Sequence, residues 1–338
     1  MYQRKHEQLF FFDMIYDKLI PADHFLRKLH SIINWDRIET HLTKLHTSAK
    51  GRPAYNPLMM VKTLLLQFLY DLSDRQLEEH VNDRISFRYF LGIDPTDKIP
   101  DHTNYCRFRD SLGEETIAAL FNDVVEQSRA KGFVKDRLCI VDATHVRARV
   151  DTFRMTTTKS NDASGEPPSQ VDPDATHGYK SPQKPFFGYK VGIGVDNDSA
   201  IVTQVTATTG KDHDSTHFSA VADSHARAVT ADKGYDTPEN FQLLNDHHQT
   251  AAIIVKHRKG KHRGHIKACY PNKTAYQKYY YFKRFRPAVE KVFATAKQWY
   301  GLARARYWGL AKMKIQALMT MMAINLKRMV TLETCLLS

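Results

Sequence analysis

The chain has 338 residues, of which 42% are hydrophobic and 25% are charged, a composition typical of globular proteins that excludes wholesale disorder. At roughly 150 residues per domain, this length predicts about two domains, each large enough to bury its own core. The 49 Lys and Arg against 37 Asp and Glu leave a formal net charge of +12, which favours a polyanionic partner, most commonly nucleic acid.

The cysteines and the apolar segments bear on the compartment. The 4 cysteines lie far apart and form no CxxC pair, which argues against a disulfide scaffold and suits a reducing compartment. No small-residue cleavage site follows the N-terminal segment, so we predict no signal peptide. The most apolar C-terminal stretch, 317–326, is too short to span a bilayer. We expect a soluble, cytoplasmic protein with no membrane partner.

The first 130 residues have helical patterns. Asn56-Pro57 predicts a helix start, with Asn as the cap and Pro in the first turn. The apolar run 58–70 then predicts a buried core helix. Ser73, with Gln76 three residues later, is a capping-box signature that opens a second helix.

A third helix is predicted to begin near Asp101 and a fourth to run from Glu114 to Lys131 and end at Gly132. Short helices with tight turns and one polar, basic helix resemble a helix-turn-helix module, although any small bundle can produce this pattern. Contact of the third helix with DNA and a purely structural role therefore both remain open. The candidate DNA-binding residues on this helix are His102, Asn104, Arg107 and Arg109.

From Asp136 onward the pattern changes to strands. Short apolar or alternating runs predict strands at 137–141, 188–196, 201–207, 228–231 and 251–255. Helices are expected from 215 to 226, from Thr237-Pro238 onward, over 283–303 and over 310–330. Three meandering strands followed by strands that alternate with helices predict a mixed α/β sheet. Five prolines among Ser, Thr, Asp and Gly make 151–185 a predicted long polar loop.

The segment 256–306 is strongly basic. It contains 15 Lys and Arg and a single acid, Glu290, a surplus that exceeds the net charge of the whole chain. Such dense like charge indicates either a nucleic-acid surface or a solvated basic face. Aromatic residues at 276–285 either stack on bases or form the apolar face of a helix, and we favour a mixture of the two. The candidate DNA-binding residues here are Lys256, Arg258, Lys259, Lys261, Arg263, Lys283 and Arg284.

Three acids suggest chemistry. Asp142 and Asp232 follow apolar strands, and acids at the carboxyl ends of sheet strands face the crevice where α/β proteins place ligands. Glu290 is the lone acid of the basic segment, with Arg286 on the same helix face. Carboxylates from separate elements can hold two Mg²⁺ ions, which would activate water and stabilise a leaving oxygen at a phosphodiester. The alternative is that Asp232 caps a turn and Glu290 only pairs with Arg286.

These residues resemble a known family. The segments VDATHV at 141–146, ADKGYD at 231–236, and RPAVE with a lysine seven residues later, from Arg286 to Lys297, are similar to the three acidic blocks of DDE transposases from bacterial insertion sequences. The group that matches best is conventionally numbered family five within the insertion-sequence-four-like set. Residues 52–115 resemble the N-terminal domain that accompanies this core, so the resemblance spans nearly the whole chain.

The resemblance implies an α/β fold in which a ribonuclease-H-like mixed sheet forms the catalytic core behind an N-terminal helical domain. The implied boundaries are a helical, helix-turn-helix-like DNA-binding domain at 1–132, the core at 133–306 with the polar loop 151–185 and a basic insertion 256–282, and a C-terminal helix at 307–338. Asp142, Asp232 and Glu290 would bind two Mg²⁺, which Mn²⁺ would replace. Arg286 and Lys297 match the Arg and Lys of the family's Tyr-Arg-Glu-Lys signature, whereas Lys283 stands at the Tyr position.

The implied function is a transposase, an endonuclease of a mobile element that takes part in DNA recombination. It would bind the inverted-repeat ends of its insertion sequence, nick DNA by Mg²⁺-dependent hydrolysis, and join the 3′-hydroxyl ends to target DNA. Its partner would be double-stranded DNA, with a homodimer on the DNA and a nucleoid-associated place in a bacterial cytoplasm. The alternatives are a non-catalytic DNA-binding regulator derived from a transposase, and a nuclease with the same core but no strand transfer.

Several histidines have an open role. His145 either assists near the metals or hydrogen-bonds in the turn after the strand, and we favour the second. For His213 and Asp214 we favour helix capping. His257, His262, His265 and Cys269 match no standard zinc spacing, so we expect a basic loop rather than a zinc site.

Overall fold

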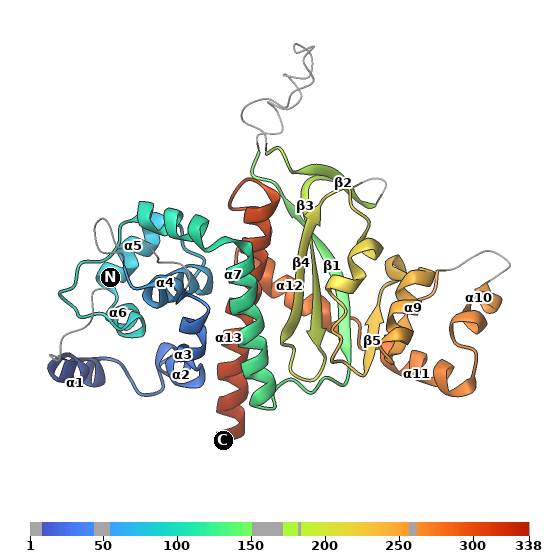
Figure 1. Ribbon diagram of the computed structural model, residues 1–338, viewed down its shortest axis with the longest axis horizontal. Coiled ribbons are helices and arrows are strands. Elements are labelled where there is room, and N and C mark those ends of the chain that lie inside the picture. Colours follow the sequence, from blue (N-terminus) through green and yellow to red (C-terminus); the bar gives the residue numbers. More distant parts are fainter. Residues whose placement is uncertain (1–8, 44–54, 151–171, 182–183, 257–261, 338) are drawn as a thin grey trace, which may run out of the picture. The chain divides into compact units, whose positions relative to one another are not determined.

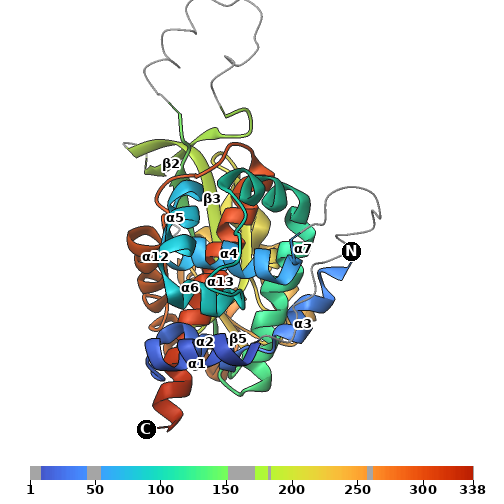
Figure 2. The ribbon, with the colours of Figure 1, turned by 90° about the vertical axis from the view of Figure 1, so that its left-hand side faces the viewer.

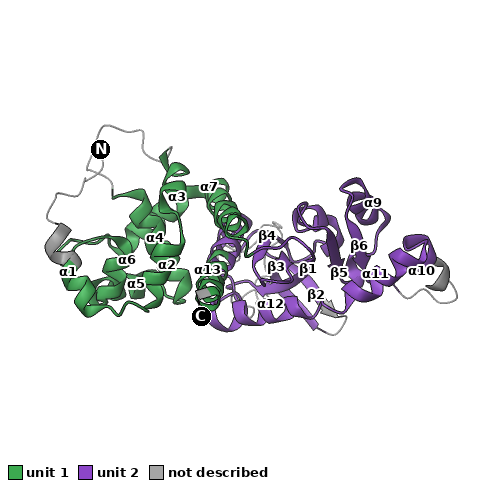
Figure 3. Cartoon of the chain, turned by 90° about the horizontal axis from the view of Figure 1, so that it is seen from below, with its two compact units in different colours: residues 1–133, 322–338 green, residues 134–321 purple. Residues whose placement is uncertain are grey.

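The computed structural model describes the chain except for residues 1–8, 44–54, 151–171, 182–183, 257–261 and 338. It divides into two compact units, residues 1–133 with 322–338 and residues 134–321 (Figure 3). Among the described residues, none of the helices has the length and apolar character that a membrane span requires. The last helix, α13 (Leu310–Leu337), begins in the second unit, and its final turns belong to the first.

The first unit is helical, as predicted (Figure 2). The helix α4 (Pro57–Leu69) is its buried centre, because every residue of this helix except Leu58 is buried. The Asn56 side chain accepts hydrogen bonds from the backbone N–H groups of Leu58 and Met59, which confirms the predicted cap. The other helices are α1 (Leu9–Leu19), α2 (Phe25–Ile32), α3 (Trp35–Thr40), α5 (Asp74–Asp83), α6 (Ile85–Leu91) and α7 (His102–Ala130).

The third and fourth predicted helices form one element, α7, with a sharp break inside it. Gly113 has φ 69°, which interrupts the helix because only glycine adopts this conformation readily. The predicted start is confirmed by Asp101, whose side chain accepts from Thr103 N and Asn104 N. Ser73 and Gln76 form both hydrogen bonds of the capping box at the start of α5.

The second unit is a mixed sheet of six strands: β1 (Cys139–Arg147), β2 (Thr176–Ser181), β3 (Lys184–Asp196), β4 (Val202–Thr209), β5 (Ala228–Ala231) and β6 (Thr250–Ile253) (Figure 1). The long strand β3 lies between β1 and β4 and pairs antiparallel with both. On its other edge, β1 pairs parallel with β5, and β5 pairs parallel with β6. Four strands, β1 to β4, pair antiparallel, and β5 and β6 extend the sheet in parallel from β1. This mixed sheet confirms the predicted α/β class and agrees with the ribonuclease-H-like core that the resemblance implied.

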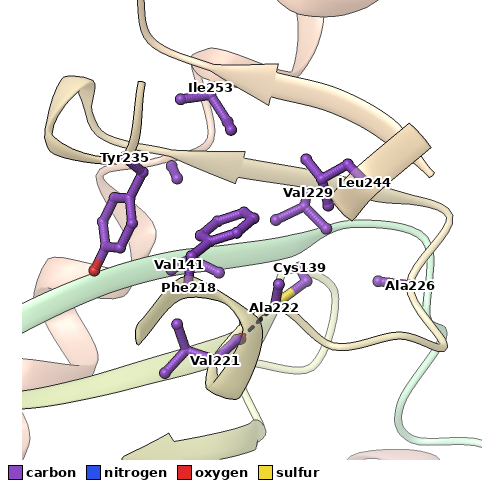
Figure 4. Close-up of a cluster of buried hydrophobic side chains, with 11 residues drawn as sticks. Cys139, Val141, Phe218, Val221, Ala222, Ala226, Val229, Tyr235, Leu244 and Ile253 are labelled. Carbon is purple, nitrogen blue, oxygen red and sulfur yellow. Dashed lines mark hydrogen bonds between the residues drawn. The ribbon is translucent and has the colours of Figure 1, made fainter. Parts of the chain in front are cut away.

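The remaining elements of this unit are the 3₁₀ helices η2 (Asp214–Ala220) and η3 (Lys233–Tyr235) and the helices α9 (Pro238–Asp246), α10 (His262–Cys269), α11 (Lys273–Lys283) and α12 (Ala288–Trp299). One core cluster lies between the sheet and these elements, where Phe218, Val221 and Ala222 pack against Cys139 and Val141 of β1 (Figure 4). The buried cluster anchors the segment over which β1 and β5 pair. It thereby positions the acids that follow this segment on the two strands.

Three details of the predicted elements were wrong. The expected helix 215–226 is only the short η2, because the chain turns at Asp223, whose buried carboxylate accepts from His225 N before β5 begins. The expected loop 151–185 contains β2, which pairs with the first residues of β3. The strand expected to end at 141 continues to Arg147, since its backbone keeps pairing with β3 as far as Gly188.

Candidate active site

The parallel ladder between β1 and β5 brings two acids side by side. Its last pair is Val141 with Ala231, and the next residues along the two strands are Asp142 and Asp232. Because neighbouring strands lie about 4.8 Å apart, residues at this position emerge next to each other. Asp142 therefore lies in the middle of β1, but at the end of the segment that pairs with β5.

Each aspartate has one carboxylate oxygen fixed by the backbone. Oδ1 of Asp142 accepts from Ala143 N at 2.9 Å, and Oδ1 of Asp232 accepts from Lys233 N at 2.6 Å. Asp232 is thus the cap of η3, one of the two roles considered for it. In both residues the other oxygen, Oδ2, points toward Arg286.

A single guanidinium joins the three predicted acids. Nη2 of Arg286 lies 3.2 Å from Oδ2 of Asp142 and 3.5 Å from Oδ2 of Asp232. Its Nη1 lies 3.7 Å from Oε1 of Glu290, four residues later. Arg286 lies in the turn before α12 and Glu290 in the first turn of that helix, so the single helix expected over 283–303 is interrupted here. The helix α12 packs against β1 (Figure 1), which places this pair over the strand that carries Asp142. The carboxylates of Asp142, Asp232 and Glu290 therefore lie around one guanidinium, although these residues are far apart in the sequence.

The surroundings make one of these acids hard to ionise. Burial raises the pKa of Asp142 to about 6, against the opposing effect of the Arg286 guanidinium, and the negative charges of Asp232 and Asp214 raise it further. Burial also raises the pKa of Tyr235, which lies beside the same acids.

The donor set fits a divalent metal in chemistry, whereas the conformation described here is arranged around the guanidinium. Three carboxylates supply the hard oxygen ligands that Mg²⁺ and Mn²⁺ prefer. Among the described residues, no group of three or more His, Cys, Asp or Glu has a metal-binding arrangement. The Oδ2 atoms of Asp142 and Asp232 both lie within 3.5 Å of Arg286 Nη2, so the guanidinium occupies the space beside the two oxygens that a shared cation would use.

The remaining candidate DNA-binding and catalytic residues of the second unit are the basic residues of the segment 256–306. Lys297 is in the last turn of α12, seven residues after Glu290. Lys283 lies over the ring of Tyr280 with its Nζ 3.6 Å from the ring centre, and Arg284 lies 4.3 Å from that of Tyr281. Lys256 is partly exposed. The predicted contacts Arg258, Lys259 and Lys261, and the side chain of Arg263, fall outside the described part of the chain.

The aromatic residues of α11 divide between a buried and an exposed face. Tyr279 is buried and stacks on Tyr270, with ring centres 4.5 Å apart. Tyr276, Tyr280 and Tyr281 keep 40–50% of their surface exposed beside the cations just described. The helix therefore has an apolar face directed inward and an aromatic, basic face in solvent.

In the first unit, the structure separates the candidate DNA-binding residues. Arg107 is exposed, Asn104 is partly exposed, and His102 is hydrogen-bonded to Glu78 at 2.9 Å. Arg109 is 4% exposed and forms two hydrogen bonds to the Asp74 carboxylate, at 3.1 and 3.0 Å. The prediction that Arg109 contacts DNA was wrong for this conformation, because its guanidinium is buried inside the helical unit and paired with Asp74.

The structure also shows two residues that the sequence did not single out as functional. Nζ of Lys190, on β3, lies 3.0 Å from the Asp214 carboxylate and donates to the Asp212 carbonyl at 2.8 Å. The capping role expected for His213 and Asp214 was wrong, since η2 has no side-chain cap. The sequence signal that could have identified Lys190 was its place in the mostly apolar strand 188–196, because a buried charge requires a partner.

The structure describes the surroundings of His145, one of the histidines whose role the sequence left open. His145 is inside β1 rather than in a turn, and its ring packs on Phe186 at 5.0 Å between ring centres. His257 and the side chains of His262 and His265 lie outside the described residues. Cys269 is a free thiol.

Comparisons with known proteins identify the family of this chain. Residues 14–111 match a family described as a transposase domain, DUF772, and residues 134–326 match the transposase DDE domain. A cryo-EM structure of the piggyBac transposase synaptic complex with hairpin DNA is similar over 92% of this chain and 74% of that one, with 11% sequence identity and a TM-score of 0.38. The DDE-domain match includes all three acids and Arg286, and it covers more than half of the sequence. The chain therefore belongs to the DDE transposase family.

Proposed function

We propose that this protein is the active transposase of a bacterial insertion sequence. It binds the inverted-repeat ends of its element, nicks DNA by metal-dependent hydrolysis, and joins the freed 3′-hydroxyl ends to target DNA. The observation that carries this proposal is the convergence of Asp142, Asp232 and Glu290 on one guanidinium at 3.2–3.7 Å. A site that serves only to stabilise the fold does not need three acids around a partly exposed cation.

The three acids would hold two Mg²⁺ or Mn²⁺ ions, which activate the attacking oxygen and stabilise the leaving one when they are bound. The contribution of the protein is positioning. Backbone N–H groups at Ala143 and Lys233 fix the first oxygen of each aspartate, so that the second oxygen has a defined direction. Glu290 is exposed and on a helix, so its side chain can approach the two aspartates by changing rotamer.

Arg286 has two successive roles in this proposal. Without metal, its guanidinium balances the three carboxylates. If the carboxylates held divalent cations, like-charge repulsion would disfavour the guanidinium beside them. Arg286 would then be available to contact a phosphate beside the scissile bond, where planar, bidentate recognition favours arginine. Lys297, farther along α12, would contact the same strand of DNA as a point charge.

The basic segment would hold the nucleic acid that the acids alone repel. Lys283 and Arg284 lie at the end of α11, directly before Arg286, and their aromatic partners are exposed. This surface suits phosphates and unstacked bases together. Two element ends must be brought together for joining, so we expect a homodimer on DNA. Light scattering of the DNA complex will test it.

The decisive experiment uses a supercoiled plasmid that carries the element's own ends. Asp142→Asn and Glu290→Gln should abolish nicking in Mg²⁺, while binding to an end fragment in a gel-shift assay persists. Glu115→Gln is the matched control, because it removes an exposed helical carboxylate of α7 that is remote in sequence from the three acids. Undiminished nicking by both active-site variants would refute the assignment.

The same assay separates the alternatives. End-specific binding by the wild type, with no nicking across a Mg²⁺ and Mn²⁺ titration, would identify a regulator derived from a transposase. Nicking without joined products in a two-substrate reaction would identify a nuclease that lacks strand transfer.

A further inference from the structure

A fourth acid lies beside the catalytic trio with its own cation. Asp214, the first residue of η2, forms an ion pair with Lys190 at 3.0 Å, and both side chains are partly buried. The strand β3 carries Lys190 directly opposite His145 of β1, three residues beyond Asp142. This pair belongs to neither the acidic trio nor the basic segment.

The pair lines a small cavity of about 10 Å³. Ala143, which follows Asp142, and Tyr235, the last residue of the η3 helix that Asp232 caps, line this cavity together with Lys190, Asp214 and His217. The glycine at 192 keeps it open, because a Cβ there would come within 3.2 Å of Thr206 and Val221. A space of this size with hydroxyl, ammonium and carboxylate walls suits a single water molecule.

A buried amide fixes Asp214 relative to Asp232. Nδ2 of Asn240 donates to the carbonyl of Ser215 at 3.3 Å and to that of Tyr235 at 3.0 Å. This amide thereby links Ser215 of η2, the residue after Asp214, to Tyr235, the last residue of η3. The electrostatics agree with this proximity, since the charge of Asp214 acts on the pKa of both Asp142 and Tyr235. The backbone next to Asp214 is therefore tied to the segment that follows Asp232 by hydrogen bonds that do not involve Arg286.

We propose that Asp214, oriented by Lys190, is a positioning residue of the catalytic site, and that its carboxylate accepts hydrogen bonds from the water that hydrates a divalent ion bound at Asp142. The proposal rests on the proposed function, because it needs the trio to bind metal. Hard divalent ions keep several waters when they bind to proteins. Acceptors for those waters strengthen metal binding, and their removal typically costs about 10- to 100-fold in affinity. The Lys190 ammonium, 3.0 Å from the Asp214 carboxylate, holds that carboxylate at the wall of the cavity.

The test is direct binding of Mn²⁺ to the full chain without DNA, measured by electron paramagnetic resonance of the free ion and by calorimetry. We expect Asp214→Asn to weaken Mn²⁺ binding about 10-fold and Asp214→Glu to recover part of the loss. Asp246→Asn is the matched control, since it removes an exposed acid at the end of α9. Thermal unfolding of each variant in EDTA will show whether it is folded at the temperature of the titration.

The outcomes separate the two levels of inference. If Asp142→Asn binds Mn²⁺ like the wild type, the proposed function itself fails. If Asp142→Asn loses binding while Asp214→Asn keeps wild-type affinity, the role of Asp214 is overturned. A lower melting temperature with unchanged Mn²⁺ affinity would also overturn it, because that result describes a purely structural ion pair.

Lys190 provides an independent check. If it acts only through Asp214, Lys190→Met should weaken Mn²⁺ binding in the wild type but have little further effect in Asp214→Asn. Lys211→Met, at an exposed position near η2, controls for the loss of one positive charge. Tighter Mn²⁺ binding by Lys190→Met would contradict the proposal, since it would mean that Lys190 merely opposes the metal by charge.

Discussion

Asp142 offers a test of the site that needs neither DNA nor metal. Its carboxyl is buried beside two other acids, and its pKa is about 6 in the folded protein, against 3.8 for an unperturbed side chain. Folding therefore costs free energy whenever this group must be ionised. We expect Asp142→Asn, which removes the charge but keeps the shape, to stabilise the protein at neutral pH.

The sign and magnitude follow from linkage. Below pH 4 the carboxyl is protonated in both the folded and the unfolded chain, so the substitution has little effect. Between pH 4 and about 6 the unfolded chain ionises this carboxyl while the folded chain keeps it protonated, so the cost of folding grows over this range and stays constant above it. The pKa difference corresponds to about 3 kcal/mol. We expect about 2 kcal/mol, because the Asp142 side chain keeps 18% of its surface in solvent.

The assay is thermal unfolding of wild type and Asp142→Asn in EDTA, from pH 4 to pH 8. For a unit of this size, about 2 kcal/mol corresponds to a rise of about 4–8 °C in melting temperature, present at pH 7.5 and absent at pH 4. Asp198→Asn, at a partly exposed turn, should show no such pH dependence. A variant that is less stable than wild type at pH 7.5, or equally shifted at every pH, would refute the electrostatic description of the site.

The remaining predictions concern single contacts. Arg109→Ala should lower the free energy of unfolding by about 3 kcal/mol in urea titrations, because it leaves Asp74 without its buried partner; a change below 1 kcal/mol would contradict this role. Arg107→Ala should leave stability unchanged and make the salt dependence of end binding shallower by about one phosphate contact, and an unchanged slope would place recognition elsewhere. Arg286→Gln should tighten Mn²⁺ binding without DNA about 10-fold, since about 1.4 kcal/mol of competing charge is removed; weaker binding would show that Arg286 supports the metal site. Gly194→Ala should lower the free energy of unfolding by about 2 kcal/mol or more, because the added Cβ would lie 2.2 Å from the Val221 carbonyl oxygen. Wild-type stability in a urea titration would mean that the backbone at Val221 shifts freely to make room.

Local sequence rules predicted much of the fold, and particular residues show why. The helix start at Asn56, the capping box at Ser73 and the start of α9 at Thr237 depend on side chains that bond to backbone only two or three residues away. The strands that carry Asp142 and Asp232 were found because continuous apolar runs mark buried strands. The 3₁₀ helix η2 was predicted too long, because its end depends on Asp223 meeting the core.

The positions of Asp142, Asp232 and Glu290 in the chain, their family signature and the concentration of positive charge around 256–306 were all determined by the order of residues alone. Only the tertiary structure decided that one arginine joins the three acids, that Arg109 is buried while Arg107 is exposed, and that Lys190 faces Asp214. The physical reason is range. Caps, turns and periodic apolar faces are interactions between near neighbours, whereas burial and charge pairing depend on which surfaces the packed sheet brings together.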